Sequence, residues 1–326
     1  MAKARSLKGK LAQLRLLRSA PHSPQRVQEL RTALGDASNL VVAEAAEIAG
    51  EARLGELAPD LAAAFDRFLD NPVKRDPLCR AKNAIAEALN KLEFSDEDFF
   101  WRGARYVQLE PVWGGTKDTA APLRVACAFS LVRTRASGLL TFLVDLLCDP
   151  EKPARIGAVQ ALAYSESDAA YLVLRLKARL GDPEPEVVSE CFNGLVSLKP
   201  EEGVFFVAEF LDAHDEAVRE AAILALGDSR RREAFEFLKA FWEKCIDARV
   251  QEIVLMALSL LRLPPAVDLL LTLVAAENQA VAEAALSALA LHRYDERLRE
   301  RTAAAVAKNG RAALLAHFKK CFRVNN

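Results

Sequence analysis

Residues 218–227 read VREAAILALG, and this stretch decides the fold. Val218, Ala222 and Leu226 are apolar or small, and their four-residue spacing places them on one face of a helix. The same pattern recurs in VVAEAAEIAG (41–50), AKNAIAEALN (81–90), LRVACAFSLV (123–132), ARIGAVQALA (154–163), VVSECFNGLV (187–196), VQEIVLMALS (250–259) and VAEAALSALA (281–290). The usual interval is about 32 residues, and the first two intervals are wider. The sequence therefore predicts a stacked array with two insertions.

Each of these segments follows a second apolar segment with helical spacing, for example AFEFLKAFW (234–242). A turn rich in Asp, Pro and Glu separates the two, as in GDPEPE and DAHDEA. Because neither helix can bury its apolar face alone, stacking on neighbouring units must do so. We predict an all-α fold of about eight two-helix repeats, and we find no strand or Asn-Gly hairpin signals.

A second regularity lies at the turns. Cations occupy the second position of several repeated segments, and a carboxylate lies six residues before most of them: Lys82, Arg124, Arg155 and Arg219, with Asp76, Asp118 and Asp149. These residues resemble the Asp and Arg ladder of HEAT repeats. The short period and the (V/A)RxxAxxAL core resemble the HEAT-like repeats of phycobilisome lyases, and the stretch QLEPVWGGTKD (108–118) resembles bacterial HEAT-repeat proteins. The resemblance implies a right-handed α-solenoid over residues 23–297, with a capping helix within 1–22 and capping helices within 298–326.

The ladder has two interpretations. Each cation can pair with a turn carboxylate and so fix the stacking of the units. Alternatively, the cations line a groove that holds phosphates, as in DNA-repair glycosylases built on HEAT-like repeats. The net charge of −1 gives no overall attraction to nucleic acid, although residues 1–31 carry eight basic side chains against one acidic. We favour the structural interpretation and do not expect nucleic acid as a partner.

The two insertions are predicted at 68–80 and 108–122, on the same edge of neighbouring units. The second contains QLEPVWGGTKD (108–118), in which Pro and Gly-Gly interrupt the helical pattern. Trp113 has two interpretations: it anchors a partner, or it folds back to cover the helices of its repeat. In the first case, we expect it to act with neighbouring charged residues, namely Arg102, Arg105, Glu110 and Lys117.

No catalytic motif stands out. No histidine pair has metal-ligand spacing, no Cys-x-x-Cys occurs, and phosphate-loop and nucleophile motifs are missing from the sequence. Cys127 and Cys191 occupy a repeated small core position, so we do not read them as nucleophiles. We expect no enzymatic activity and no cofactor or metal. The longest apolar run is too short to span a bilayer and no convincing signal peptide occurs, so a cytoplasmic location without membrane contact is expected.

In HEAT arrays the second helix of each unit lines the concave groove, so the resemblance points to exposed positions of the repeated segments. These include an apolar residue in the middle and acidic residues toward the C-terminus: Phe129, Glu220, Glu252 and Glu283. A helix or extended peptide with basic residues suits such a groove. We therefore predict a non-catalytic scaffold that binds a protein or peptide through this groove and the loop 108–118. A helper that handles a bilin, by analogy with the lyases, is a less supported alternative.

Overall fold

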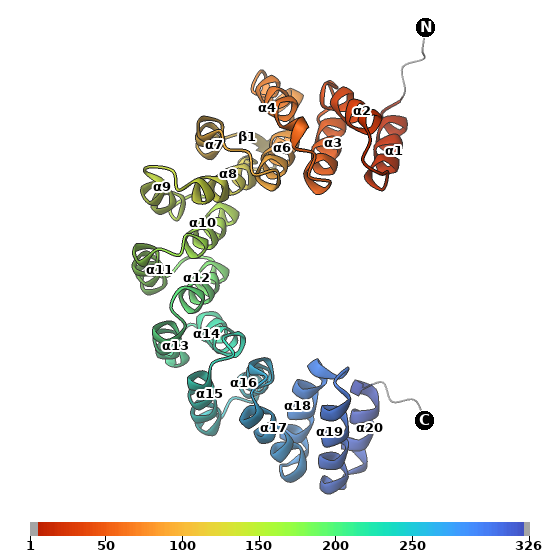
Figure 1. Cartoon of the computed structure of the whole chain (residues 1–326). Helices are drawn as coiled ribbons and strands as arrows, with labels where there is room; N and C mark the ends of the chain where they lie inside the picture. Colours follow the sequence, from red (N-terminus) through yellow and green to blue (C-terminus); the bar gives the residue numbers. More distant parts are fainter. Residues whose placement is uncertain (1–5, 323–326) are drawn as a thin grey trace. The chain divides into compact units, whose positions relative to one another are not determined.

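The computed structural model describes residues 6–322, and the chain divides into two compact units, Met1–Ser165 and Glu166–Asn326. The predicted terminal caps therefore lie partly outside the described residues. The first unit contains α1 (Leu7–Arg18), α2 (Pro24–Leu34), α3 (Asn39–Glu51), α4 (Ala58–Arg67), α5 (Pro72–Arg75), α6 (Arg80–Lys91), α7 (Glu97–Ala104), β1 (Leu109–Val112), β2 (Gly115–Asp118), α8 (Ala121–Thr134), α9 (Leu139–Leu146) and α10 (Lys152–Tyr164) (Figure 1).

The second unit is built only of helices within its described residues. It contains α11 (Asp168–Leu180), α12 (Pro185–Leu198), α13 (Pro200–Ala208), α14 (Glu216–Asp228), α15 (Arg232–Lys244), α16 (Ala248–Leu261), α17 (Pro264–Ala276), α18 (Gln279–Leu289), α19 (Glu296–Asn309) and α20 (Ala312–Phe322). Short 3₁₀ turns complete the two units at Gly55–Leu57, Pro77–Cys79, Glu209–Asp212 and Ala290–His292.

The repeated segments all fall on the second helices of helix pairs. In the first unit these are α3, α6, α8 and α10, and in the second α12, α14, α16 and α18. Within each unit, successive second helices pack on one another and the first helices flank them (Figure 1). Each unit is therefore a stretch of α-solenoid, and the prediction of about eight helix pairs is confirmed within residues 6–322.

The core follows the repeat. The fifth and ninth residues of all eight segments have exposed fractions of 0%, from Ala45 and Ala49 to Ala285 and Leu289. Where the fifth residue is alanine or cysteine, its small side chain allows neighbouring second helices to lie close together. Leucine at the ninth position of most segments fills the space between the first and the second helices. The apolar pattern read from the sequence is thus the buried face of every second helix.

Gly227 shows how closely the second helices approach. A β-carbon added there would lie 2.7 Å from the carbonyl oxygen and 2.8 Å from the α-carbon of Ala257, on the next second helix. We expect Gly227→Ala to lower the free energy of unfolding by about 1–3 kcal/mol, because α14 and α16 must move apart. Urea unfolding measures this. Gly55→Ala is the control, since an added β-carbon there meets nothing within 4 Å, and equal effects of the two changes would contradict the packing argument.

The prediction of no strands is wrong at one place. Residues 109–118 form a β-hairpin, with Val112 paired to Gly115 and Leu109 paired to Asp118. Trp113 and Gly114 make the two-residue turn, and Gly114 adopts φ +85°, which favours glycine. Pro111 is tolerated in β1 because it faces Thr116 in a non-hydrogen-bonded pair. The nitrogen of Pro111 points away from β2, so the ladder loses no hydrogen bond through the absence of an N–H group.

Candidate partner-binding surfaces

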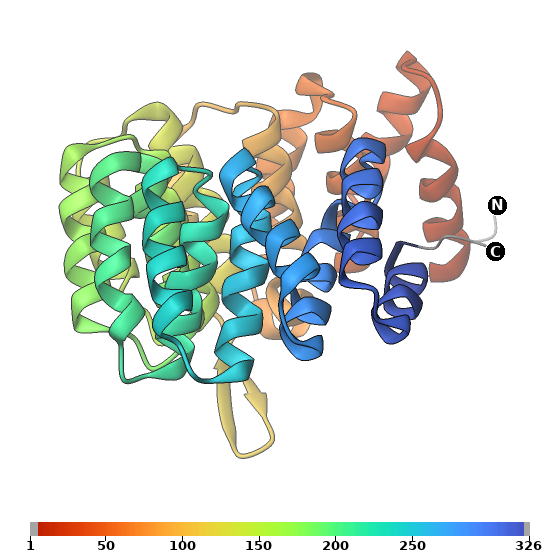
Figure 2. The ribbon, with the colours of Figure 1, turned by 90° about the horizontal axis from the view of Figure 1, so that it is seen from below.

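The hairpin extends beyond the ends of the helices of the first unit (Figure 2). Trp113 at its turn has an exposed fraction of 103%, so the indole ring contacts no other part of the described chain. The interpretation of Trp113 as a cover for its own repeat is therefore wrong. Val107, Leu109 and Val112 along the hairpin are also exposed.

Glu110 lies at the hairpin base and is buried, with an exposed fraction of 7%. Its Oε1 atom accepts hydrogen bonds from Leu78 N at 2.6 Å, Gln108 Nε2 at 2.7 Å and Thr119 Oγ1 at 2.7 Å. The prediction that Glu110 contacts a partner is therefore corrected: its carboxylate is committed to fixing the hairpin on the helices.

Two of the hydrogen bonds at the hairpin base join the two insertions, which the sequence placed on one edge. They run from Leu78 N to Glu110 Oε1 at 2.6 Å and from Gln108 Nε2 to the carbonyl of Asp76 at 2.8 Å. Within the second insertion, Thr119 N donates to the carbonyl of Gln108 at 2.9 Å. Sequence reasoning missed Gln108 and Thr119. The available signal was the glycine pair Gly114-Gly115, because glycine favours the tight two-residue turn of a β-hairpin.

The other charged residues near the hairpin are exposed. Arg102 forms an ion pair with Asp66 at 2.9 Å, and the Arg105 guanidinium lies 4.8 Å from the ring centre of Trp101. Lys117 lies on β2 opposite Glu110 in the strand register. Arg102 lies on α7, Arg105 directly follows α7 and Lys117 lies on the hairpin, and all three remain candidate partner contacts.

Four ladder residues of the first unit are buried, namely Asp76, Lys82, Asp118 and Arg124. Lys82 Nζ lies 2.8 Å from Asp76 Oδ2, and both side chains have exposed fractions of 0%. Asp76 also accepts from the backbone N–H groups of Ala81 and Lys82 at the start of α6. Arg124 lies 2.5 Å from Asp118 and 2.8 Å from Asp149. Lys82 and Arg124 hold the turns together, and their burial excludes them from a phosphate-binding surface.

Arg155 and Arg219 use backbone acceptors six residues upstream. The Arg155 guanidinium donates to the carbonyl of Asp149 at 2.9 Å, and that of Arg219 donates to the carbonyl of Ala213 at 3.1 Å. The side chain of Gln251 makes the equivalent bond to the carbonyl of Cys245. A carboxylate six residues upstream is therefore not required, because the geometry of the turn already presents an acceptor.

Two of the four lysines and arginines of the predicted N-terminal cap within the described residues, Lys10 and Arg18, are paired with acids. Arg18 bonds three glutamates of α3, and Lys10 lies 2.6 Å from Asp36. Burial alone would raise the pKa of Asp36, but the bonds from Lys10 and from the backbone of Ser38 outweigh it and hold that pKa below its ordinary value. This region therefore presents less free positive charge than its composition suggests.

The exposed positions of the second helices line two pockets, one in each unit. In the first unit, a pocket of about 420 Å³ lies over α6 and α8 and is lined by Glu87, Val125 and Phe129 among others. Phe129 is half-buried, and its ring centre lies 5.8 Å from that of Tyr164. The structure thus places this predicted residue at the wall of a pocket.

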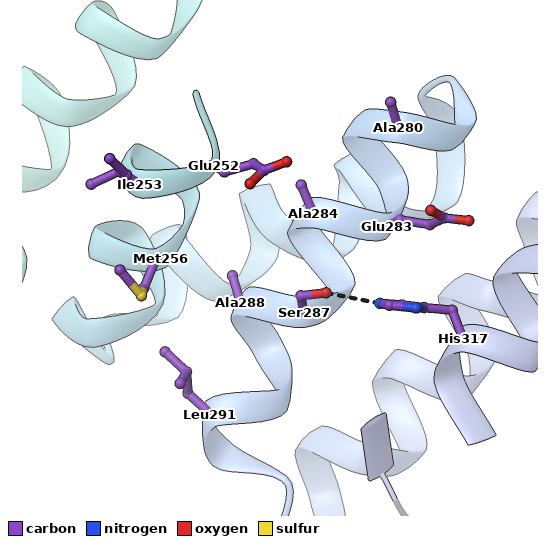
Figure 3. A pocket seen from close by; sticks show the side chains of 10 residues that line it. All are labelled: Glu252, Ile253, Met256, Ala280, Glu283, Ala284, Ser287, Ala288, Leu291 and His317. Carbon is purple, nitrogen blue, oxygen red and sulfur yellow. Dashed lines mark hydrogen bonds between the residues drawn. The ribbon is translucent and has the colours of Figure 1, made fainter. Parts of the chain in front are cut away.

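In the second unit, a pocket of about 530 Å³ lies over α16, α18 and α20 (Figure 3). Glu252 and Glu283 line it. Glu220 does not, since it belongs to α14, which contributes no lining residue, and its carboxylate forms an ion pair with Arg249 at 2.7 Å. Two of the three predicted acids are therefore brought together. Ser287 and His317 also belong to the lining and are joined by a hydrogen bond of 2.8 Å, which the sequence gave no reason to expect.

The buried cysteines behave as core residues. Cys79 and Cys191 lie at 0% exposure, and burial raises the pKa of each thiol to about 12. Burial likewise raises the pKa of Cys127. Among residues 6–322, no group of three or more His, Cys, Asp or Glu is placed to hold a metal ion, and no helix has the length and apolar character to cross a membrane.

Comparison with known families gives a match to HEAT repeats over residues 172–259 and 207–290, which covers the helix pairs from α11 to α18. The chain contains HEAT repeats. The matched residues include the second helices α12, α14, α16 and α18, and α16 and α18 line the pocket of the second unit. No curated protein matches the chain.

Solved structures with similar folds include the CpcE–CpcF complex of phycocyanin lyase from Nostoc sp., with 17% identity, coverage of 70% of this chain and 89% of that one, and a TM-score of 0.35. Human deoxyhypusine hydroxylase is 20% identical, with coverage of 79% and 91% and a TM-score of 0.31. An engineered protein is 16% identical, with coverage of 99% and 95% and a TM-score of 0.34. At these scores the likenesses carry no argument about function.

Proposed function

We propose that the chain is a non-catalytic scaffold that binds another protein through the tip of the 109–118 hairpin and through the faces of its second helices. The observation that carries this proposal is the full exposure of Trp113. HEAT repeats present extended surfaces suited to protein partners. The location of the two pockets on the second helices adds to this support.

An exposed tryptophan at a hairpin turn is a costly feature for a structure that gains no packing from it. Tryptophan buries a large area when a partner covers it, and it is among the residues that dominate binding energy. Glu110 and Gln108 fix the base of the hairpin, so little conformational freedom is lost when the tip is bound. This arrangement suits a preorganised anchor for a protein partner.

The test compares the wild-type chain with Trp113→Ala in affinity purification from the source cells, followed by measurement of the affinity for each captured protein. We expect Trp113→Ala to weaken partner binding by about 30-fold to 1,000-fold, corresponding to about 2–4 kcal/mol for a central aromatic anchor. Thr116→Ala is the matched control, because Thr116 is exposed on the same hairpin. Equal binding by the wild type and Trp113→Ala would exclude the hairpin tip as the anchor.

A further inference from the structure

The pocket of the second unit has small side chains in its lining and larger apolar side chains at one end. Ala284 and Ala288 of α18 form part of its lining, and their small side chains leave room for a large side chain from outside. Met256 and Leu291 lie at the same end as Ala288 (Figure 3). Methionine adapts its shape to an apolar ligand, so this end suits a leucine-like or aromatic side chain.

The other end of the pocket is acidic. Glu252 and Glu283 occupy equivalent positions on α16 and α18, and within residues 6–322 neither forms an ion pair. Glu283 accepts one hydrogen bond, from Gln279 at 2.9 Å. By contrast, Glu220 occupies the equivalent position on α14 and is neutralised by Arg249. The lining of the pocket within residues 6–322 therefore holds two carboxylates and no lysine or arginine, with His317 as its remaining titratable residue, and the two carboxylates complement a basic ligand.

The spacing of the two ends limits the ligand further. Met256 follows Glu252 by one helical turn, and Leu291 follows Glu283 by about two turns, so the acidic and apolar ends are separated by about 6–12 Å along the helices. A partner helix presents side chains with this separation when they are about four to seven residues apart on one face.

We infer that this pocket binds an amphipathic helical segment of a partner protein, with a lysine or arginine between Glu252 and Glu283 and a large apolar side chain against Met256 and Leu291. This inference rests on the proposed function, because it names the kind of partner segment that the scaffold takes. Acidic segments and nucleic acid are excluded from the pocket by its charge.

The test uses a fluorescent helical peptide of about four turns, with arginine and leucine about four residues apart on one face, and measures fluorescence polarisation. We expect the wild-type chain to bind this peptide and to lose affinity as salt is raised. The double variant Glu252→Gln, Glu283→Gln should bind at least about tenfold more weakly and with less dependence on salt. Ala284→Arg should also weaken peptide binding, because the guanidinium of the introduced arginine would occupy the pocket and repel the arginine of the peptide.

Two controls make the outcome specific. Glu220→Gln should leave peptide binding unchanged, since that carboxylate is already paired with Arg249. The same peptide with glutamate in place of arginine should not bind. Absence of binding by the arginine peptide, or unchanged binding by the double variant, overturns the inference. If Trp113→Ala still abolishes partner capture in that case, the proposed function stands and only the inference about the pocket fails.

Discussion

Asp76→Ala is expected to lower the free energy of unfolding of the first unit by about 3–5 kcal/mol. The substitution leaves the ammonium of Lys82 at 0% exposure, with the carbonyl of Phe68 at 3.3 Å as its remaining hydrogen-bond acceptor in the described structure. It also removes the acceptor for two backbone N–H groups at the start of α6. A buried charge without its counter-charge costs far more than the same charge in water.

Urea unfolding gives the free energy, and hydrogen exchange of α6 assigns the loss to the first unit. Arg102→Ala is the matched control, because it breaks an exposed ion pair with Asp66 and should cost at most about 1 kcal/mol. The double change Asp76→Asn, Lys82→Met removes both charges and should recover much of the loss. If Asp76→Ala costs no more than Arg102→Ala, the buried pair does not hold the turn.

Glu110→Ala is expected to loosen the hairpin and weaken partner binding although Trp113 is retained. The change leaves three donors without their common acceptor, namely Leu78 N, Gln108 Nε2 and Thr119 Oγ1. A buried donor left unsatisfied costs about 1–3 kcal/mol. Gln108 Nε2 is buried, whereas the other two donors are partly buried and Thr119 Oγ1 keeps the carbonyl of Gln108 as a second acceptor, so we expect a combined loss of about 2–4 kcal/mol. Because the preorganisation of the tip is lost, binding should fall with it.

Hydrogen exchange of β1 and β2 measures the loosening, and the affinity for the partner found with the wild type measures its consequence. Lys117→Ala should leave hairpin protection near the wild-type value, since this side chain is exposed on the opposite strand. Unchanged protection in Glu110→Ala would show that the hairpin is held by the helices without the buried carboxylate.

The sequence by itself determined the helix pairs and their core. The spacing of residues such as Ala222 and Leu226 reports a helix face that must be buried, and both residues are buried. It also identified Asp76 and Lys82 as partners, because six residues across a turn bring the two side chains together. These features depend on local periodicity repeated along the chain, and local periodicity is visible in a single sequence.

Only the tertiary structure decided which of the side chains of Glu110, Trp113 and Glu220 are buried, exposed or paired. Glu110 and Trp113 belong to one short stretch, yet the carboxylate is buried and the indole is exposed. Leu78, whose backbone N–H donates to the Glu110 carboxylate, lies 32 residues away in the other insertion. Arg249, which forms the ion pair with Glu220, belongs to the next repeat. Helix periodicity fixes which face of a helix is covered, but the partners of a polar side chain depend on which distant segments the stacking brings beside it.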